Sequence, residues 1–134
     1  MRTVLVVDDD PWVRGFARDV LAEDGYRDLE ATDGLDAIRM AADHPGPIHL
    51  LLSDVVMPGM NGCELAAGLL PLLSGMKVMF MSAYDRDFLV TSGLNLAGPV
   101  LTKPFTAEYL LRRVRMVLER PPAATPAPSS ARAR

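Results

Sequence analysis

Five apolar runs recur along the chain and alternate with segments whose apolar residues follow helical spacing. In chain order the runs cover residues 3–7, 27–31, 48–53, 77–81 and 100–102. Most of them are nearly continuous stretches of Val, Leu, Ile, Phe and Met, which is typical of strands buried on both faces. The second run alternates polar and apolar residues, as an edge strand does. Strands that alternate with helices predict a parallel sheet with helices on both faces.

The first helical segment is marked at both ends. Asp10 followed by Pro11 is typical of a helix N-cap with proline at the first helical position. Gly25 provides the stop signal. Between them, apolar residues recur at helical spacing, and we expect this stripe to face the sheet. It consists of Val13, Phe16, Ala17, Val20 and Leu21.

Two helices should flank the third strand. The earlier one is capped by Asp33 and runs to about Asp43, where a Pro- and Gly-rich stretch stops it. The later one starts near Asn61 and ends near Pro71. Short connections between these helices and the strands agree with the βαβ pattern.

The last two helices differ in how clearly the sequence specifies them. Residues 85–96 should hold a fourth helix that is short or frayed, because its second half contains several poor helix formers. These are Thr91, Ser92, Gly93 and Asn95. The fifth helix is capped by Thr106. Its core face comprises Leu110, Leu111, Val114, Val117 and Leu118.

The chain length and its composition favour one domain followed by a tail. A chain of 134 residues with 49% hydrophobic and 23% charged residues is an ordinary globular composition. Residues 1–120 hold all of the expected strands and helices. Residues 121–134 are dominated by Pro, Ala, Ser and Arg, so we expect a disordered tail there.

Charge and cysteine content exclude several classes of function. A formal net charge of −3 gives no reason to expect direct nucleic-acid binding. The single cysteine, Cys63, excludes an internal disulfide and suits a reducing compartment. We expect no signal peptide and no membrane span, because no apolar stretch approaches the roughly 18 residues that a span needs. The expected location is the cytoplasm.

Polar residues gather where the expected strands end. Asp54 follows the third run, and the acidic pair Asp8 and Asp9 follows the first. Ser82 and Lys103 follow the fourth and fifth runs. Because the carboxyl ends of parallel strands meet at one edge of the sheet, these five side chains should converge on one site.

Three carboxylates at one site repel one another. At about 5 Å and an effective dielectric constant of 20, each pair costs on the order of 3 kcal/mol. A hard divalent cation relieves this repulsion, and Mg²⁺ fits because it binds a few carboxylate oxygens and keeps several waters. One of the carboxylates would remain free to act as a nucleophile.

The opposite side of this site suits a phosphoryl group. Lys103 and the hydroxyl of Ser82 would bind its oxygen atoms, and the backbone N–H groups of Val56 and Ala83 would add donors. The inferred reaction is transfer of a phosphoryl group to a carboxylate of this site.

Over roughly residues 2–119 the chain resembles the receiver domain of two-component response regulators. The matching stretches occur in the family's order and spacing. They are Val-Val-Asp-Asp-Asp at 6–10, Asp-Val-Val-Met-Pro-Gly-Met-Asn-Gly at 54–62, Met-Ser-Ala at 81–83 and Lys-Pro-Phe at 103–105. The resemblance implies an α/β, flavodoxin-like three-layer sandwich, with five helices around a five-stranded parallel sheet of order 2-1-3-4-5.

The same resemblance assigns a role to each residue of the site. It implies that Asp54 is the phosphoacceptor, Lys103 contacts the phosphoryl group and Ser82 is the switch hydroxyl. Val56 and Ala83 would bind the phosphoryl group through their backbones. The implied Mg²⁺ ligands are Asp8, Asp9, Asp54 and the carbonyl of Val56.

One position departs from the family pattern. Receivers commonly have an aromatic residue three positions before the lysine, and it rotates when the switch hydroxyl moves. This chain has Val100 there. Tyr84, two residues after Ser82, is the candidate substitute, so the expected switch comprises Ser82, Tyr84 and Val100.

The implied function is signal transduction in a two-component phosphorelay. A sensor histidine kinase or histidine phosphotransfer protein would donate the phosphoryl group, and a downstream protein target would read the result. The chain would be a monomer or a weak, phosphorylation-dependent dimer, without direct contact to nucleic acid or membrane. It would catalyse at most its own phosphorylation and dephosphorylation. The sequence around the third and fourth expected strands is similar to that of receivers in hybrid histidine kinases.

Two other classes of function remain open at the level of sequence. An aspartyl phosphatase of the haloacid-dehalogenase type would use the Asp-x-Asp pattern at 8–10, with Lys103 as its lysine. It would also need an acidic metal-binding pair after Lys103, where only Glu108 and Glu119 are found. A receiver fold used purely as a binding module is the second alternative.

Trp12 has two interpretations. It lies in the first turn after the acidic pair and would either border the metal site or be a half-buried surface aromatic residue.

Overall fold

A computed structural model describes residues 1–120, and the predicted tail at 121–134 lies outside the described residues. The strands and helices alternate as expected. The strands are β1 (Thr3–Val7), β2 (Arg27–Ala31), β3 (Leu50–Asp54), β4 (Lys77–Ser82) and β5 (Val100–Thr102). The helices are α1 (Pro11–Glu23), α2 (Gly34–Asp43), α3 (Gly62–Leu69), α4 (Arg86–Thr91) and α5 (Ala107–Glu119).

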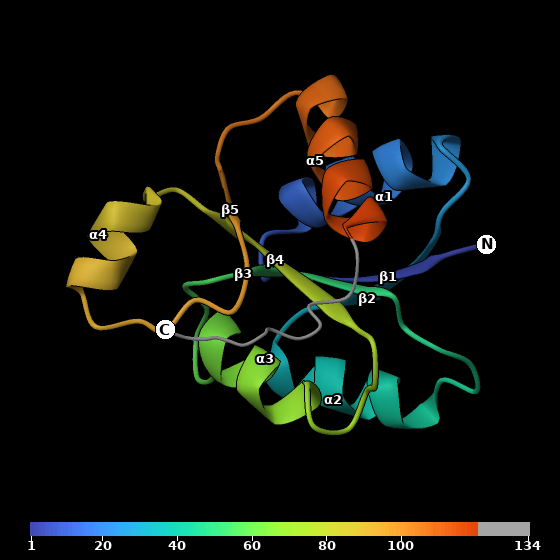
Figure 1. Cartoon of the computed structure of the whole chain (residues 1–134), viewed down its shortest axis with the longest axis horizontal. Coiled ribbons are helices and arrows are strands. Elements are labelled where there is room, and N and C mark those ends of the chain that lie inside the picture. The colour runs from blue at the N-terminus through green and yellow to red at the C-terminus, as the bar shows by residue number, and fades with distance from the viewer. Residues whose placement is uncertain (121–134) are drawn as a thin grey trace, which may run out of the picture.

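The five strands form one parallel sheet in the order β2-β1-β3-β4-β5, which confirms the predicted fold. Helices α1 and α5 cover one face and α2 and α3 the other, while α4 lies beyond the β5 edge (Figure 1). The sheet therefore separates two apolar clusters, one packed under α1 and α5 and one under α2 and α3. Among the described residues, no helix is long and apolar enough to cross a bilayer.

The register of the strands brings their carboxyl ends together. Val7 lies opposite Ser53, and Asp54 lies opposite Met81. The residues that follow β1, and those that end β3 and β4, are therefore level at one edge of the sheet. This alignment brings Asp8, Asp54 and Ser82 to the same edge, as the pattern of strand ends predicted.

Side-chain caps fix where the helices begin. Asp10 accepts a hydrogen bond from the N–H of Trp12 at 2.9 Å, and Asp33 accepts one from Asp36 at 2.8 Å. Thr106 caps α5 in the same way. These caps confirm the three predicted from sequence, because each provides an acceptor for a backbone N–H that the helix leaves free.

Some strand bounds and one side-chain position differ from the prediction. Strand β3 begins at Leu50 instead of Ile48, and β4 includes Ser82. Strand β3 runs from Leu50 to Asp54, so Asp54 is the last residue of the strand instead of the first residue after it. Phe16 was expected to face the sheet with the rest of its stripe, and this is wrong. Its side chain is 41% exposed, and its ring lies 6.1 Å from that of Phe105. It lies at the margin of the stripe, whose centre, Ala17 and Leu21, is fully buried.

Candidate functional site

Three carboxylates meet where β1 and β3 end. Asp8, Asp9 and Asp54 each present an oxygen atom within 4.8 Å of the others. Asp8 is fully buried and Asp54 nearly so, whereas Asp9 is exposed. The cluster is therefore open to solvent on one side and enclosed by the sheet on the other.

Backbone and side-chain contacts fix Asp8 in place. Its Oδ1 accepts the N–H of Asp10 at 2.9 Å. Its carbonyl accepts Nη1 of Arg14 at 2.8 Å, and its own N–H reaches the carbonyl of Ala31 at 3.3 Å. Arg14 is also paired with Glu30, 3.5 Å away. Arg14 was not expected at the site; its position one helical turn after Asp10 was the available signal.

Lys103 lies between two of the carboxylates. Its Nζ is 2.9 Å from Oδ2 of Asp8 and 3.4 Å from Oδ1 of Asp54. Burial alone lowers the pKa of this ammonium, but the hydrogen bond to Asp8 and the charges of Asp54 and Asp8 outweigh burial and raise it. Lys103 is therefore a fixed positive charge in direct contact with the cluster.

Asp54 is a carboxylate that is costly to ionise. Burial and, after it, the charge of Asp8 raise its pKa, Lys103 acts in the opposite direction, and the net pKa is about 6. The carboxyl thus titrates near neutrality when no cation is bound. A titratable carboxyl with one neighbouring cation at an open sheet edge is typical of a functional site.

The turn after β3 folds back against Asp54. A Cβ added to Gly62 would lie 2.3 Å from the carbonyl oxygen of Asp54, so only glycine fits there. The N–H of Gly62 donates to the carbonyl of Val55 at 2.8 Å, and Asn61 caps α3. Gly62 was part of the matched stretch, but this steric role could not be deduced from spacing alone.

Ser82 ends β4 beside this cluster and is 1% exposed. Its hydroxyl oxygen accepts the N–H of Tyr84 at 2.9 Å, and its carbonyl accepts the N–H of Lys103 at 2.7 Å. Ala83 follows it in the exposed loop, and Val56 is 57% exposed after Asp54. The loops that carry both predicted backbone groups are thus accessible to a ligand at the sheet edge.

An aromatic groove adjoins the site. It has a volume of about 250 Å³ and is lined by Trp12, Val13, Phe16, Lys103, Pro104 and Phe105. Trp12 is 86% exposed, so it is not half-buried, and it shares this groove with the site lysine. The sequence could place Trp12 near the acidic pair but could not show that its ring projects into solvent.

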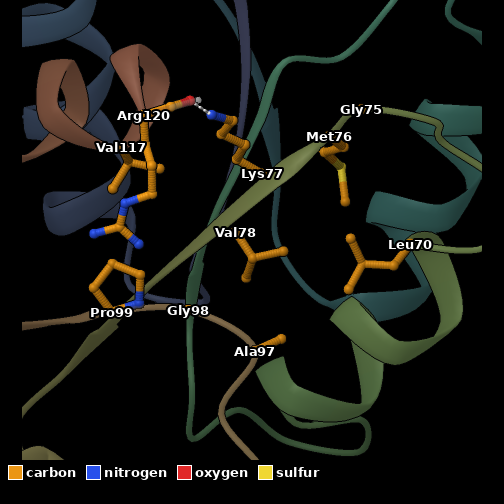
Figure 2. Close-up of a pocket in the computed structure, with 10 residues that line it drawn as sticks. All are labelled: Leu70, Gly75, Met76, Lys77, Val78, Ala97, Gly98, Pro99, Val117 and Arg120. Atoms are coloured by element: carbon orange, nitrogen blue, oxygen red, sulfur yellow. Dashed lines mark hydrogen bonds between the residues drawn. The ribbon is translucent and has the colours of Figure 1, made fainter. Parts of the chain in front are cut away.

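A larger hollow of about 440 Å³ lies elsewhere (Figure 2). Its lining includes Lys77 and Val78 at the start of β4, Gly98 before β5, and Arg120 after α5. The ammonium of Lys77 donates to the carbonyl of Arg120 across it. Because β4 begins here and ends at Ser82, this hollow is at the opposite edge of the sheet from the carboxylates.

The residues of the cluster suit a hard divalent cation. Three carboxylates (−3) and Lys103 (+1) sum to a formal charge of −2, which one dication would neutralise. All three side chains offer oxygen atoms, the ligands that Mg²⁺ prefers. The exposed side of the cluster leaves room for the waters that Mg²⁺ retains.

The structure brings Asp8, Asp9, Asp54 and Lys103 together by direct contact or proximity, as predicted. The acidic residues required by the phosphatase alternative are not in this group. Within residues 1–120, Glu108 and Glu119 are exposed on α5 and outside the acidic cluster.

Comparison with known proteins gives a consistent result. A family model described as the response regulator receiver domain matches residues 4–115. "Response regulator MprA" of Mycobacterium ulcerans is 37% identical over 119 residues, which cover 87% of this chain and 50% of that protein. An "uncharacterized transcriptional regulatory protein YbdJ" of Bacillus subtilis is 31% identical over 116 residues, with the same coverage of both chains. The chain thus spans about half the length of these curated relatives.

Solved structures also match. The receiver domain of the hybrid histidine kinase CckA is 35% identical, with a TM-score of 0.74 over 87% of this chain and 99% of that one. The response regulator TrrA of Thermotoga maritima, solved with Mg²⁺-BeF, is 28% identical, with a TM-score of 0.71 and the same coverage.

Proposed function

Because this chain belongs to the response regulator receiver domain family, we propose that Asp54 is its phosphoacceptor. One observation supports this most strongly. Asp54 is the carboxylate that both adjoins the acidic pair and has the ammonium of Lys103 within 3.4 Å. Nucleophile, cation ligands and a positive charge for the incoming group thus occupy one sheet edge.

In the proposed reaction a carboxylate oxygen of Asp54 attacks the phosphorus of a phosphohistidine. The new O–P bond forms as the P–N bond breaks, and the electron pair of that bond leaves with the imidazole, which takes a proton from solvent. Lys103 compensates the charge on the phosphoryl oxygens, and the backbone N–H groups of Val56 and Ala83 donate to them. Ser82 donates its hydroxyl to the remaining oxygen.

The proposed cofactor is Mg²⁺, held by Asp8, Asp9, Asp54 and the carbonyl of Val56. The neighbour TrrA, solved with Mg²⁺-BeF, supports this assignment. When bound, the ion neutralises charge on the carboxylates and on the transferred group. Lys103 also contacts Asp8 and Asp54 and so competes with the cation for the same charge.

The proposed donor is a sensor histidine kinase or a histidine phosphotransfer protein. Such a donor must approach the open side of the carboxylates, and the aromatic groove of Trp12 lies there, sharing Lys103 with the site. An exposed tryptophan that lines a groove together with Lys103 is a natural contact for a partner protein. The chain acts in the cytoplasm as a signalling domain and passes its state to a downstream protein, not to nucleic acid directly.

Mass spectrometry tests the proposal. After incubation with a small-molecule phosphodonor and Mg²⁺, the wild-type chain should gain the mass of one phosphate. Asp54→Asn should gain none, whereas the control Asp43→Asn, at the far end of α2, should behave as wild type. If the wild type gains no mass even with its kinase, the chain is a binding module. Steady release of phosphate from many substrates would instead indicate a phosphatase.

A further inference from the structure

A hydrogen bond connects the site to the loop that precedes α4. The oxygen of the Ser82 hydroxyl accepts the backbone N–H of Tyr84 at 2.9 Å. This bond closes a tight turn over residues 82–84, because donor and acceptor are two residues apart. The hydroxyl proton is not used by this bond and remains available to another acceptor.

The side chain of Tyr84 continues this connection onto α4. Its ring stacks on that of Phe88, with ring centroids 4.7 Å apart and an interplanar angle of 24°. Both rings are about half exposed, at 48% for Tyr84 and 53% for Phe88. Phe88 lies in the first turn of α4, where its N–H donates to the capping carboxylate of Asp85 at 2.9 Å.

Helix α4 is weakly anchored. It has six residues, and Leu89 is its one buried side chain. A further contact runs from Nη1 of Arg86 to the carbonyl of Gly98 at 2.9 Å. A short helix with one buried residue opens or shifts at low free-energy cost. A change at Tyr84 can therefore move α4 without disrupting the core.

Val100, on the neighbouring strand, cannot serve the same purpose. It packs against the apolar cluster under α2 and α3 and has no polar atom to exchange partners. Among the described residues near Ser82, Tyr84 links this hydroxyl to α4. Its N–H donates to the hydroxyl oxygen of Ser82, and its ring stacks on Phe88.

We propose that Tyr84 and Phe88 form a relay that transmits the phosphorylation state of Asp54 to α4. It rests on the proposed role of Asp54. When the Ser82 hydroxyl turns to donate to a phosphoryl oxygen, its oxygen leaves the N–H of Tyr84. The turn at 82–84 opens, the stacked ring of Tyr84 moves, and Phe88 carries the start of α4 with it.

Hydrogen exchange across residues 86–94 tests the relay. Exchange is compared with and without beryllofluoride and Mg²⁺, which together mimic the phosphoryl group. In the wild type we expect the exchange rates to change by about threefold or more. Tyr84→Phe keeps the ring and the backbone N–H, so it should respond as the wild type does. Tyr84→Ala and Phe88→Leu remove the stack and should abolish most of the response.

A parallel mass measurement separates this proposal from the proposed function. Each variant should still gain one phosphate on Asp54, because neither ring contacts the carboxylates. A full α4 response in Tyr84→Ala and Phe88→Leu, with normal phosphorylation, would overturn the relay and leave the phosphoacceptor role intact. Loss of the mass gain in the wild type would overturn both. Circular dichroism of the variants confirms that each is folded before the comparison.

Discussion

At the scale of single residues, the site holds more negative charge than its surroundings neutralise. Asp54 and the buried Asp8 both depend on Lys103, which is 2.9 Å from Asp8 and 3.4 Å from Asp54. One ammonium cannot fully compensate two carboxylates in a buried setting. The metal-free chain is therefore destabilised at this edge. Substitutions at these residues should change its free energy of unfolding.

Replacing Asp54 by Asn should stabilise the metal-free chain at pH 8. A carboxyl whose pKa rises from 3.8 to about 6 on folding opposes folding in its ionised form. The substitution should raise the free energy of unfolding by about 1–3 kcal/mol, since roughly 1.4 kcal/mol corresponds to each pH unit. Urea denaturation in the presence of a chelator measures the difference.

The same difference should shrink as the pH falls. Between about pH 4 and 6 the folded chain keeps a proton on Asp54 that the unfolded chain has lost. The wild type therefore gains stability relative to Asp54→Asn as the pH falls through 6 toward 4. A difference that stays constant from pH 8 to pH 4 would show that Asp54 is ionised in both states throughout this range.

Replacing Lys103 by Met should strengthen Mg²⁺ binding and slow phosphorylation. Removing the ammonium leaves the carboxylates with more uncompensated negative charge, so Mg²⁺ affinity should rise by about tenfold. The phosphorylation rate should fall on the order of 10²-fold, because the transferred group loses its positive contact. Titration followed by the fluorescence of Trp12, the chain's single tryptophan, reports Mg²⁺ binding. Weaker Mg²⁺ binding in the variant would contradict the competition between lysine and cation.

At the scale of secondary-structure elements, local chemistry made most of the fold predictable. Apolar runs located all five strands, and the caps Asp10, Asp33 and Thr106 located three helix starts. Helix α4 was expected to be short, and it has six residues. These features depend on residues close in sequence, so the pattern alone was sufficient to predict them.

Contacts between distant elements were less predictable. The exposure of Phe16 depends on where the loop carrying Phe105 lies, far along the chain. The bond from Arg14 to the carbonyl of Asp8 depends on how α1 packs against the end of β1. The spacing of the strands predicted that the site residues lie at one sheet edge. It could not show that Lys103 lies closer to Asp8 than to Asp54.

Replacing Trp12 by Ala should slow phosphoryl transfer from a protein donor selectively. If the groove between the start of α1 and the loop after β5 contacts the donor, loss of the exposed indole should reduce this rate by about tenfold. The rate with a small-molecule phosphodonor should stay within about twofold of wild type, because such a donor needs no docking surface. Leu35→Ala, at an apolar residue of α2 that is 66% exposed, is the control. Equal losses with both donors would mean that Trp12 acts on the site itself.

At the scale of the whole molecule, Mg²⁺ binding should be coupled to folding. A ligand that binds only the folded chain stabilises it by about 2.7 kcal/mol at a concentration 100 times its dissociation constant. We expect the urea midpoint to rise with Mg²⁺ concentration in the wild type. Asp9→Asn should lose most of this rise while keeping its midpoint in chelator, since Asp9 is exposed. A Mg²⁺ effect of equal size in that variant would place the ion elsewhere.

The two apolar clusters on opposite faces of the sheet bear on how the chain meets its partners. The groove of Trp12 borders the cluster under α1 and α5, whereas Leu89 anchors α4 to the cluster under α2 and α3. Helix α4 lies beyond the β5 edge, whereas α1, whose first turn lines the groove, covers one face of the sheet (Figure 1). A donor that binds the groove and a reader that binds α4 would therefore contact different elements of the fold, each backed by a different apolar cluster.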